Sequence, residues 1–568
     1  MEIRAPRIIH PTIGRSVGVL ATCILAALVA NGVLLLGSET FPNIDLLSHY
    51  RWVSQFTHVL QEGTLYPRWM PWSNNGFGEP TFLIYQPLYF YCAAALNMIT
   101  GDAWVAMRLL SFASTLCIAL LGFWILSRYC EFGIALTGAV LLAVQPFSTF
   151  LTAYHAAYPW QFSLAIALSV LYFSLRRTSR FIDVPVSASV ALLTLAHVLV
   201  SFMVMVCLAI TLLVGRRGPG ERGKWIALLS WGLSAGLGLA LAGVYLIPAL
   251  DAPRLISLHL ADDPVFINWR NSFAFPTVTA GIYGIRWFGM QWVLAVVPAA
   301  ILAASVLLLR RTGTSGCASN LASGLTLASM VALLLSSELS FPIYAASALF
   351  RRVQWPYRFL TIATIASALA LPLIVGATRE SSRPVAHRAL VTALALSLLV
   401  LAVIQYRLWV EGGEPRLGAS VLQRFVGQRG FEPATAGQAW KETDAHAILE
   451  QSCRRPEVRH CATLLDQAHH RIWEVTLDHP ARMLFPLFAF PAWRATIDTV
   501  PVQSGIDPDL GVIVIAVPAG RHLVGVEWAP LPPERIGAAV SLLAAGVLAL
   551  ALLWQKYRVG PQPLGVQA

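Results

Sequence analysis

Charged side chains are scarce in this sequence. Aspartate, glutamate, lysine and arginine make up 12% of its 568 residues, whereas hydrophobic residues make up 57% and the mean hydropathy is +0.64. A soluble domain carries about twice that charged fraction, so the composition excludes a soluble protein. Several separate apolar runs are long enough to span a bilayer, which indicates a polytopic α-helical membrane protein.

The sequence also lacks the short motifs of several enzyme classes. It contains no glycine-rich phosphate-binding loop, no HExxH and no CxxC motif, which argues against P-loop, zinc-protease and dithiol chemistry. No internal repeat is evident, which argues against a transporter built from paired halves. The adjacent acids Asp262 and Asp263 are one possible divalent-ion site, but a single acidic pair fits a solvated loop better.

Cysteines are few in the polar parts of the chain. Most of the 8 cysteines lie in or beside apolar runs, where cysteine behaves as a small hydrophobic residue. Only Cys453 and Cys461 share a polar segment. A local disulfide is expected if that segment lies outside the cytoplasm, and metal binding is less favoured without a second pair.

Positive charge is in excess and lies beside the apolar runs. The net charge of +11 is compatible with nucleic-acid binding, but positive-inside topology explains it better, so no nucleic acid is expected as a partner. Val17–Leu36 is expected to be a signal anchor with a cytoplasmic N-terminus, since no cleavage site follows it. The arginines that support this topology are Arg4, Arg7, Arg15, Arg176, Arg177, Arg180, Arg216, Arg217, Arg310 and Arg311.

Counting the crossings so that the basic loops lie on the cytoplasmic side predicts roughly 11–13 membrane helices. Leu83–Ile99 is expected to be a partial or interfacial helix, because counting it as a crossing conflicts with the flanking arginines. Val184–Val214 has basic flanks at both ends, which predicts a hairpin of two short helices that turns near His197. The other predicted crossings are Trp104–Leu126, Ile134–Leu151, Trp160–Leu175, Trp225–Leu250, Trp292–Leu309, Leu321–Leu335, Phe359–Val375, Ala389–Val403 and Ile536–Trp554.

A long polar segment precedes the last crossing. Residues 411–535 show strand-like alternation in His470–Leu477, in Leu510–Val517 and, after a turn at Pro518–Gly520, in Arg521–Trp528. We therefore expect a small, mainly β domain outside the cytoplasm, with a helical or irregular first half. The predicted organisation is a membrane domain (1–410) with a first external loop (37–82), the β domain (411–535), and a last helix and cytoplasmic tail (536–568).

The stretch Phe41–Tyr91 concentrates polar chemistry, turns and aromatic rings. Twelve aromatic residues lie between Tyr50 and Tyr91, a density expected of a segment along a membrane interface. Asp45 follows the first membrane helix by about one turn, and His49 lies four residues later, on the same face if the segment is helical. Asp45 is therefore either a catalytic base or an acid in the first turn of a helix.

Other residues of the external face are candidates for substrate binding. Glu79 in GFGEP either points a carboxylate into a site or ends a loop, and Arg68 either contacts a lipid phosphate or belongs to an interfacial anchor with Trp69 and Trp72. The segment RRVQWPYRF (Arg351–Phe359) places arginines at an outer boundary of the membrane. Positive charge there opposes the positive-inside trend, which favours an anionic partner for this segment. The remaining polar candidates, each with a structural alternative, are His155, Tyr158, Gln161, His197, Arg351 and Arg358.

Together these motifs resemble a family of bacterial membrane proteins. The order of Asp45, His49, GTLYPRW, NGFGEP, YQPLY, LAHVLVSF and VQWPYRFL resembles proteins called 6-pyruvoyl-tetrahydropterin-synthase-related or YfhO-like, and AWRATIDTVPV with VPAGRHLVGVEW resembles their external β module. This family is similar in plan to the GT-C superfamily of glycosyltransferases. The resemblance implies a GT-C-like fold, location in the bacterial inner membrane, and sugar transfer from a polyprenyl-phosphate donor to an extracytoplasmic glycan, lipid or protein.

The resemblance also implies roles for the residues named above. Asp45 matches the catalytic base, with Glu79 in reserve, and Arg68 or Arg358 would stabilise the leaving lipid phosphate. The full set of candidate substrate-binding residues, from the residues themselves and from the resemblance, is His49, Arg68, Trp69, Tyr85, His155, Tyr158, Gln161, His197, Arg351 and Arg358. The sequence departs from the superfamily pattern in two ways that count against a metal ion. Thr152–Gln161 contains no second acid, and no paired acids adjoin Asp45. The alternative function is a non-catalytic membrane scaffold or an export component.

Overall fold

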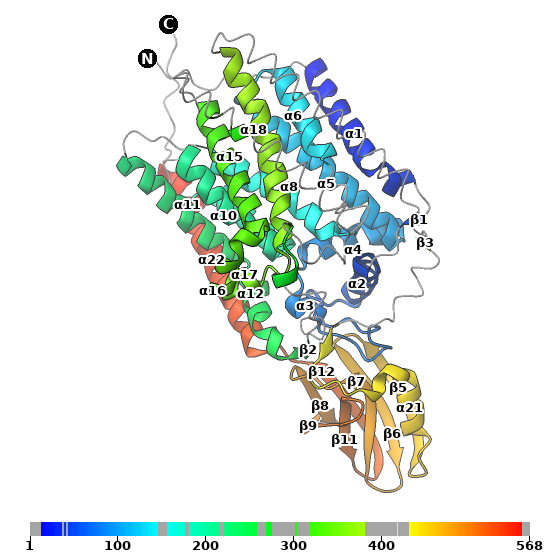
Figure 1. Cartoon of the computed structure of the whole chain (residues 1–568). Helices are drawn as coiled ribbons and strands as arrows, with labels where there is room; N and C mark the ends of the chain where they lie inside the picture. The colour runs from blue at the N-terminus through cyan, green and yellow to red at the C-terminus, as the bar shows by residue number, and fades with distance from the viewer. Residues whose placement is uncertain are drawn as a thin grey trace.

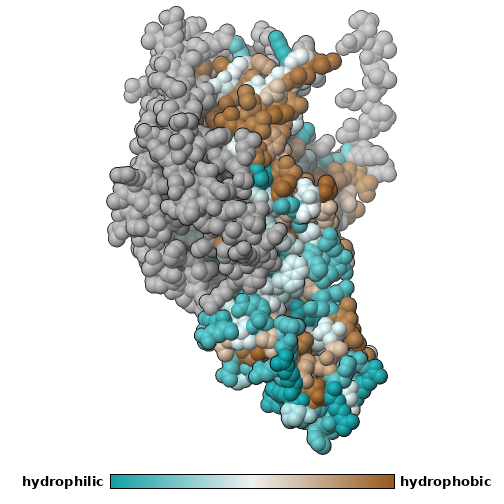
Figure 2. Space-filling model, turned by 90° about the vertical axis from the view of Figure 1, so that its right-hand side faces the viewer, coloured by the Kyte–Doolittle hydropathy of each residue, from teal (hydrophilic) through white to brown (hydrophobic). Residues whose placement is uncertain are grey.

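A computed structural model gives the fold. It describes residues 13–36, 39–40, 44–145, 156–176, 181–215, 221–257, 269–274, 302–303, 306, 317–380, 417–418 and 431–558. A bundle of helices forms one end of the molecule and a β domain forms the other, with α2 (Ile44–Gln61) and α3 (Thr81–Ile84) between them (Figure 1). The space-filling view shows hydrophobic surface over the described helices and mostly hydrophilic surface over the β domain (Figure 2).

Five helical segments within the described ranges are long and apolar enough to cross a membrane. They include α1 (Ile13–Leu36), α5 (Ala103–Leu126), α15 (Cys317–Ser336) and α22 (Pro532–Arg558), while the fifth joins the 3-10 turn η5 (Pro356–Phe359) to α18 (Leu360–Glu380). A sixth is a pair bent by 71°, α11 (Glu221–Leu241) with α12 (Gly243–Asp251). The protein is therefore a multi-span membrane protein.

Shorter helices complete the bundle. Leu83–Ile99 was predicted as a partial helix, and it forms α3 and the 13-residue α4 (Leu88–Thr100). α9 (Val184–Ala196) and α10 (Val198–Gly215) meet at His197, the residue predicted as the turn. The remaining helices are α6 (Phe132–Val144), α8 (Tyr158–Ser174), α16 (Phe341–Ala346) and α17 (Ala348–Arg351). The predicted crossing Ala389–Val403 and most of Trp292–Leu309 lie outside the described residues.

Local sequence explains where one helix ends and the next begins. Gly101 follows α4 with a φ of 70°, a left-handed conformation that glycine adopts without strain. Asp102 then caps α5, because its carboxylate accepts hydrogen bonds from the backbone N–H groups of Trp104 (2.7 Å) and Val105 (3.1 Å). Adjacent cap residues thus allow a sharp reversal between two apolar helices.

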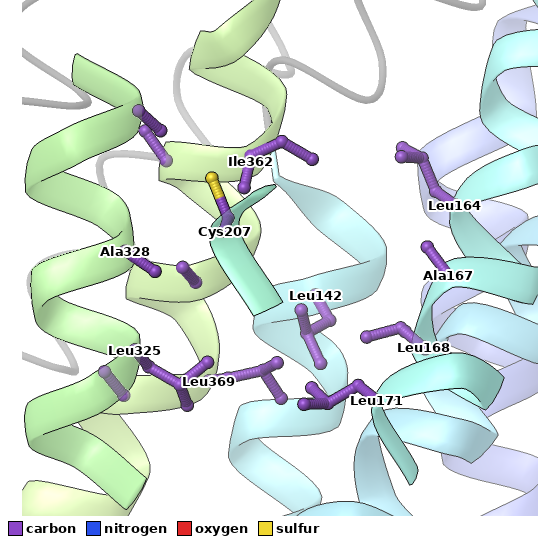
Figure 3. Close-up of a cluster of buried hydrophobic side chains, with 14 of the residues drawn as sticks. Leu142, Leu164, Ala167, Leu168, Leu171, Cys207, Leu325, Ala328, Ile362 and Leu369 are labelled. Atoms are coloured by element: carbon purple, nitrogen blue, oxygen red, sulfur yellow. The ribbon is translucent and has the colours of Figure 1, made fainter. Parts of the chain in front are cut away.

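The helices pack through apolar side chains and close backbone approaches. Leucines and alanines of α8, α15 and α18 surround Cys207 of α10 in the core (Figure 3). At Gly324 of α15 a Cβ atom would lie 2.6 Å from the carbonyl oxygen of Thr211 in α10. A small residue is therefore required where these two helices meet.

Replacing Gly324 with leucine is expected to destabilise the helical domain by about 2 kcal/mol, because the side chain would have to push α10 away. Thermal unfolding of the purified full chain in detergent measures the loss. Gly236→Leu is the matched control, since nothing lies within 4 Å of a Cβ at that position. Equal stability of the two variants would contradict the required approach.

The β domain consists of two antiparallel sheets. One has the order β5-β6-β12-β8-β9, the other β10-β11-β7, and Trp473 of the first packs on Phe485 of the second with ring centroids 4.8 Å apart. The strands are β5 (Val458–Gln467), β6 (His470–Leu477), β7 (Ala481–Phe488), β8 (Trp493–Ile497), β9 (Val500–Val502), β10 (Gly505–Ile506), β11 (Val512–Val517) and β12 (Gly520–Trp528). β6 has the predicted bounds, and β11 and β12 differ from the predicted strands by one or two residues.

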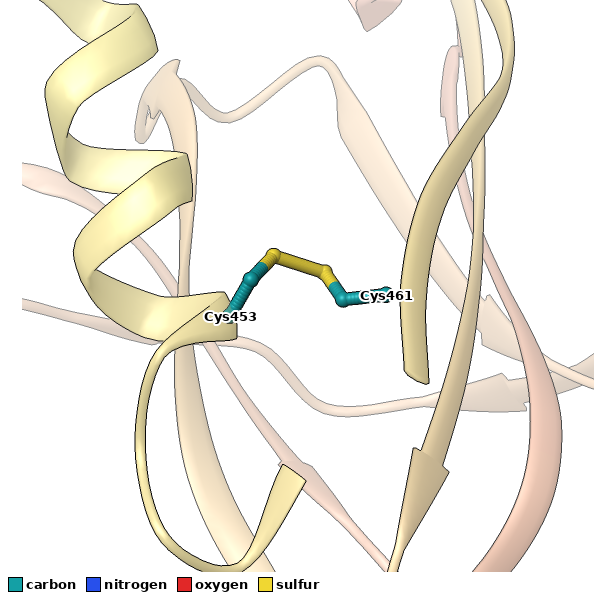
Figure 4. Close-up of a disulfide and its surroundings, with 2 residues drawn as sticks. All are labelled: Cys453 and Cys461. Carbon is teal, nitrogen blue, oxygen red and sulfur yellow. A yellow bond between two sulfur atoms is a disulfide. The ribbon is translucent and has the colours of Figure 1, made fainter. Parts of the chain in front are cut away.

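Smaller elements attach to this domain. α21 (Ala445–Cys453) precedes the sheets, and a disulfide joins Cys453 at its end to Cys461 in β5 (Figure 4). Two short strand pairs join distant parts of the chain: β1 (Glu39–Thr40) pairs with β3 (Leu417–Gly418), and β2 (Ile256–Ser257) with β4 (Glu432–Pro433). The segment before the β sheets therefore contacts both the first loop and the end of α12.

The first loop folds into the β domain. Trp69 is fully buried against Phe490, Trp493 and Trp528, and Phe77 stacks on Phe488 with ring centroids 5.2 Å apart. The interpretation of this aromatic-rich loop as a segment along the membrane interface is therefore wrong for these two rings. A pattern of aromatic residues indicates that they need burial, but it does not say which apolar partner buries them.

Candidate functional site

A cluster of polar and aromatic side chains lies where α2 meets the helical bundle. Asp45 is in the first turn of α2 and is partly exposed, whereas His49, one turn later, is buried. The Nδ1 atom of His49 lies 2.9 Å from the carbonyl oxygen of Ala156 and Nε2 lies 3.1 Å from the hydroxyl of Tyr85. Because a carbonyl only accepts, Nδ1 must carry the proton and Nε2 accepts from Tyr85.

Desolvation shifts the pKa values of the two titratable side chains at the start of α2, His49 and Asp45. Desolvation lowers the pKa of His49 to about 4, so the ring is neutral at neutral pH. Desolvation also raises the pKa of Asp45 to about 6, and the positive charge of Arg358 acts in the opposite direction and lowers it. Asp45 therefore changes charge close to physiological pH while facing a permanent cation.

Aromatic rings hold Arg358 where its charge acts on Asp45. Arg358 lies in η5, and its guanidinium carbon is 3.9 Å from the ring centroid of Trp355 and 5.0 Å from that of Trp160. Trp160 also contacts His197, with ring centroids 4.8 Å apart. The break between α9 and α10, the start of α8 and the start of α18 thus converge on one place.

The entry to α8 is strained. Ala156 has a φ of 50°, a left-handed conformation that is uncommon for alanine. That conformation presents its carbonyl to His49 and starts α8 so that Tyr158 lies beside the histidine ring, with centroids 6.4 Å apart. Among the described residues, the buried Tyr158 hydroxyl and the Trp160 Nε1 have no hydrogen-bond partner. Two donors therefore border the cluster unused.

The structure brings together six of the predicted residues: Asp45, His49, Tyr85, Tyr158, His197 and Arg358. Sequence reasoning missed Trp160 and Trp355, although each lies within three residues of a candidate. His155 and the pair Asp262 and Asp263 lie outside the described residues. Within the described ranges, no group of three or more His, Cys, Asp or Glu residues is placed to hold a metal ion.

Arg68 and Trp69 lie elsewhere, at the junction with the β domain. The Nε of Arg68 is 3.0 Å from Glu534, and its terminal nitrogens donate to the carbonyls of Phe82 (2.8 Å) and Val244 (3.0 Å). All three nitrogens of the guanidinium thus have protein partners. Arg68 fixes the loop to α12 and to the start of α22, and the geometry leaves its guanidinium no free edge for a phosphate.

Gln161 and Arg351 are also separate from the cluster. Gln161 accepts a hydrogen bond from Ser111 (2.6 Å), in a buried network that also includes Thr115 and Asn31. This network joins α1, α5 and α8 inside the bundle. Arg351 is exposed and donates to the carbonyl of Ala345 (3.1 Å).

Glu79 is enclosed at the base of the first loop. Asn74, Asn75, Gly76 and Gly78 all have positive φ, and this tight turn directs the following carboxylate inward. Glu79 is fully buried and accepts hydrogen bonds from Trp52, Ser73 and the backbone N–H of Phe431; Arg51 lies 3.5 Å away. The geometry therefore gives Glu79 a structural part in joining α2, the loop and the chain before the β sheets.

Replacing Glu79 with glutamine is expected to reduce the free energy of unfolding by about 3 kcal/mol or more, because it leaves the buried Arg51 without its counter-charge. Thermal unfolding of the full chain measures the change. Glu442→Gln is the control, since Glu442 is exposed. A variant of wild-type stability that had lost activity would contradict the structural part and favour a catalytic one.

The fold and the cluster define a multi-span membrane protein that carries a polar site at the end of its helices nearer a β domain. Residues 82–409 match the family described as "6-pyruvoyl-tetrahydropterin synthase related domain; membrane protein". This match covers more than half of the chain, so the protein belongs to that family. Asp45 and His49 lie before the matched residues.

Solved structures give distant likenesses. The mycobacterial arabinofuranosyltransferase AftD is 17% identical with a TM-score of 0.40, covering 73% of this chain and 28% of its own. The oligosaccharyltransferase AglB from Archaeoglobus fulgidus, solved with an inhibitory peptide and a dolichol-phosphate, is 13% identical with a TM-score of 0.30, covering 78% of this chain and 59% of its own. The chain thus spans only part of the length of either protein. No curated protein sequence matches it.

Proposed function

We propose that the protein is an inverting membrane glycosyltransferase of the GT-C type that takes a sugar from a polyprenyl phosphate. The observation that carries this proposal is the pairing of Asp45, whose pKa is about 6, with Arg358 held between two tryptophan rings. One group is suited to accept a proton near neutral pH, and the other to stabilise negative charge beside it.

The proposed reaction is a direct displacement. Asp45 takes the proton from an acceptor hydroxyl as that oxygen bonds to the anomeric carbon of the sugar. The bond between this carbon and the lipid phosphate breaks, and the phosphate leaves with the electron pair. Arg358 stabilises the charge that develops on the leaving oxygen, and inversion at the anomeric carbon follows from the single displacement.

The proposed orientation places the cluster and the β domain outside the cytoplasm of a bacterial inner membrane. Basic residues follow the opposite ends of three helices: Arg128 follows α5, Arg176 follows α8, and Arg558 ends α22. This distribution supports a cytoplasmic side at those ends. The acceptor is then a glycan, lipid or protein that is reached from outside.

A non-catalytic scaffold is the second candidate. The observation that favours it is the close packing of the first loop, whose Trp69 and Phe77 fill the core of the β domain. Mass spectrometry of surface glycans from cells with and without the protein separates the two functions. A missing sugar that wild-type protein restores supports the transferase, and an unchanged glycan profile supports the scaffold.

The rate of sugar transfer is expected to rise with pH through about 6 and to level off above it, because Asp45 is a base only when deprotonated. Arg358→Gln removes the charge that lowers the pKa of Asp45, so its residual activity should rise at a higher pH than that of the wild type. Initial rates at saturating donor measure both profiles. A flat profile between about pH 5 and about pH 8 would contradict Asp45 as the base.

A further inference from the structure

A polar cavity lies between the first loop and the β domain. Its volume is about 460 Å³, and it is bordered by the end of α2, the loop turn at Pro71–Gly76, the start of α21 and the strands β5–β7. Asp45 and His58 lie 13 residues apart on α2, so the cavity is about 20 Å from the proposed base at a rise of 1.5 Å per residue. It is therefore separate from the cluster around Arg358.

The floor of this cavity holds a buried guanidinium. Arg471 and Trp473 alternate on β6 so that both face inward, and Arg471 is only 5% exposed. Its Nη1 donates to the carbonyl of Pro486 (3.1 Å), while its Nε lies 3.1 Å from Asp466. Within the described residues this Nε has no partner in hydrogen-bond geometry. A buried guanidinium that pairs with the exposed Asp466 thus borders the cavity.

The rim combines an aromatic face with carboxylates. Trp72 is 39% exposed and lies beside His58, with ring centroids 4.7 Å apart. Asp466 is 66% exposed, and Glu62 and Asp444 also border the cavity. These carboxylates outnumber the single arginine, so the local charge disfavours an anionic ligand.

A saccharide matches this set of groups. A sugar ring presents C–H groups that pack on an indole face, and hydroxyls that both donate to carboxylates and accept from a guanidinium. The volume lies in the range of small-ligand sites, about 300–1,000 Å³. The excess of carboxylates favours a neutral sugar over a phosphorylated or acidic one.

We propose that this cavity binds a neutral saccharide unit of the acceptor glycan. Its part as an acceptor subsite rests on the proposed function, whereas saccharide binding itself does not. A subsite about 20 Å from the base would favour elongated acceptors over monosaccharides, because a single sugar does not reach both places.

Binding of neutral hexasaccharides to the purified full chain tests the proposal. Saturation-transfer NMR with gluco-, manno-, galacto- and arabino-hexasaccharides identifies a ligand, and a titration gives its Kd. Trp72→Ala and Asp466→Asn are each expected to weaken binding by about tenfold or more. Trp72 is exposed, so its substitution disturbs no core. Asp466 is the counter-charge of the buried Arg471, so thermal unfolding of Asp466→Asn is measured beside its Kd to separate lost binding from lost stability. Trp554→Ala, at an exposed tryptophan near the far end of α22, is the matched control and should bind like the wild type.

The outcomes separate this proposal from the transferase. Wild-type affinity in Asp45→Asn supports the cavity as the binding place, whether or not that variant transfers sugar. Loss of binding in Asp45→Asn with retention in Trp72→Ala would overturn the proposal, since the ligand would then lie at the α2 cluster. Failure of all four hexasaccharides to bind the wild-type chain would also overturn it.

Discussion

Asp45→Asn is expected to reduce sugar transfer by about 10²- to 10⁴-fold, the usual contribution of a positioned general base. The amide keeps the size of the side chain but cannot accept the proton of an acceptor hydroxyl. Asp45 is partly exposed in the first turn of α2, so the substitution leaves the surrounding core unchanged. Single-turnover transfer from a radiolabelled polyprenyl-phosphate sugar measures the chemical step.

Asp509→Asn serves as the control for Asp45→Asn, because it makes the same chemical change at an exposed residue of the β domain. Both variants should insert into the membrane and unfold at the wild-type temperature. Full glycosylation by a properly inserted Asp45→Asn protein would refute the transferase mechanism and leave the scaffold as the better account.

Arg358→Gln is expected to reduce transfer by about 10²- to 10³-fold, as removal of a group that stabilises transition-state charge usually does. Glutamine is polar and of similar length, but it brings no positive charge to the leaving phosphate. Arg358→Lys should recover only part of the loss, since a compact ammonium does not stack on Trp355 and Trp160 as a planar guanidinium does. The rate at saturating donor separates this effect from weaker donor binding.

Arg352→Gln is the control for the charge at position 358. Arg352 is exposed and lies six residues earlier in the chain, so its loss removes an equal charge away from the cluster. Equal losses in the two variants would point to general attraction of an anionic lipid. Wild-type rates in Arg358→Gln would rule out the proposed contact with the leaving group.

Much of the fold follows from patterns that act locally. Period-two alternation gave the bounds of β6, and matching basic flanks placed the break between α9 and α10 at His197. Both features depend on forces that act within a short segment, namely burial of one strand face and the cost of moving arginines across a membrane. The residues of the segment itself are therefore enough to predict the bounds of β6 and the break at His197.

The site was predictable only in part. His197 and Arg358 both meet Trp160 at the start of α8 from distant parts of the chain, and their individual candidacy followed from ionisable groups near the ends of apolar runs. Arg68 and Gln161 were polar candidates as well, but Arg68 pairs with Glu534 and Gln161 with Ser111. Those partners are far away in the chain, so a single sequence does not distinguish a substrate-binding residue from a saturated structural one.

The way the first loop is built into the β domain also affects biosynthesis. The backbone N–H of Arg68 contacts His469, which lies 401 residues later in the chain. At about 5–20 residues per second, the ribosome needs about 20–80 s to produce the residues between them. Trp69 and Phe77 are therefore synthesised long before their partners in the β domain exist. Final packing of the first loop against the β domain must wait until translation is almost complete.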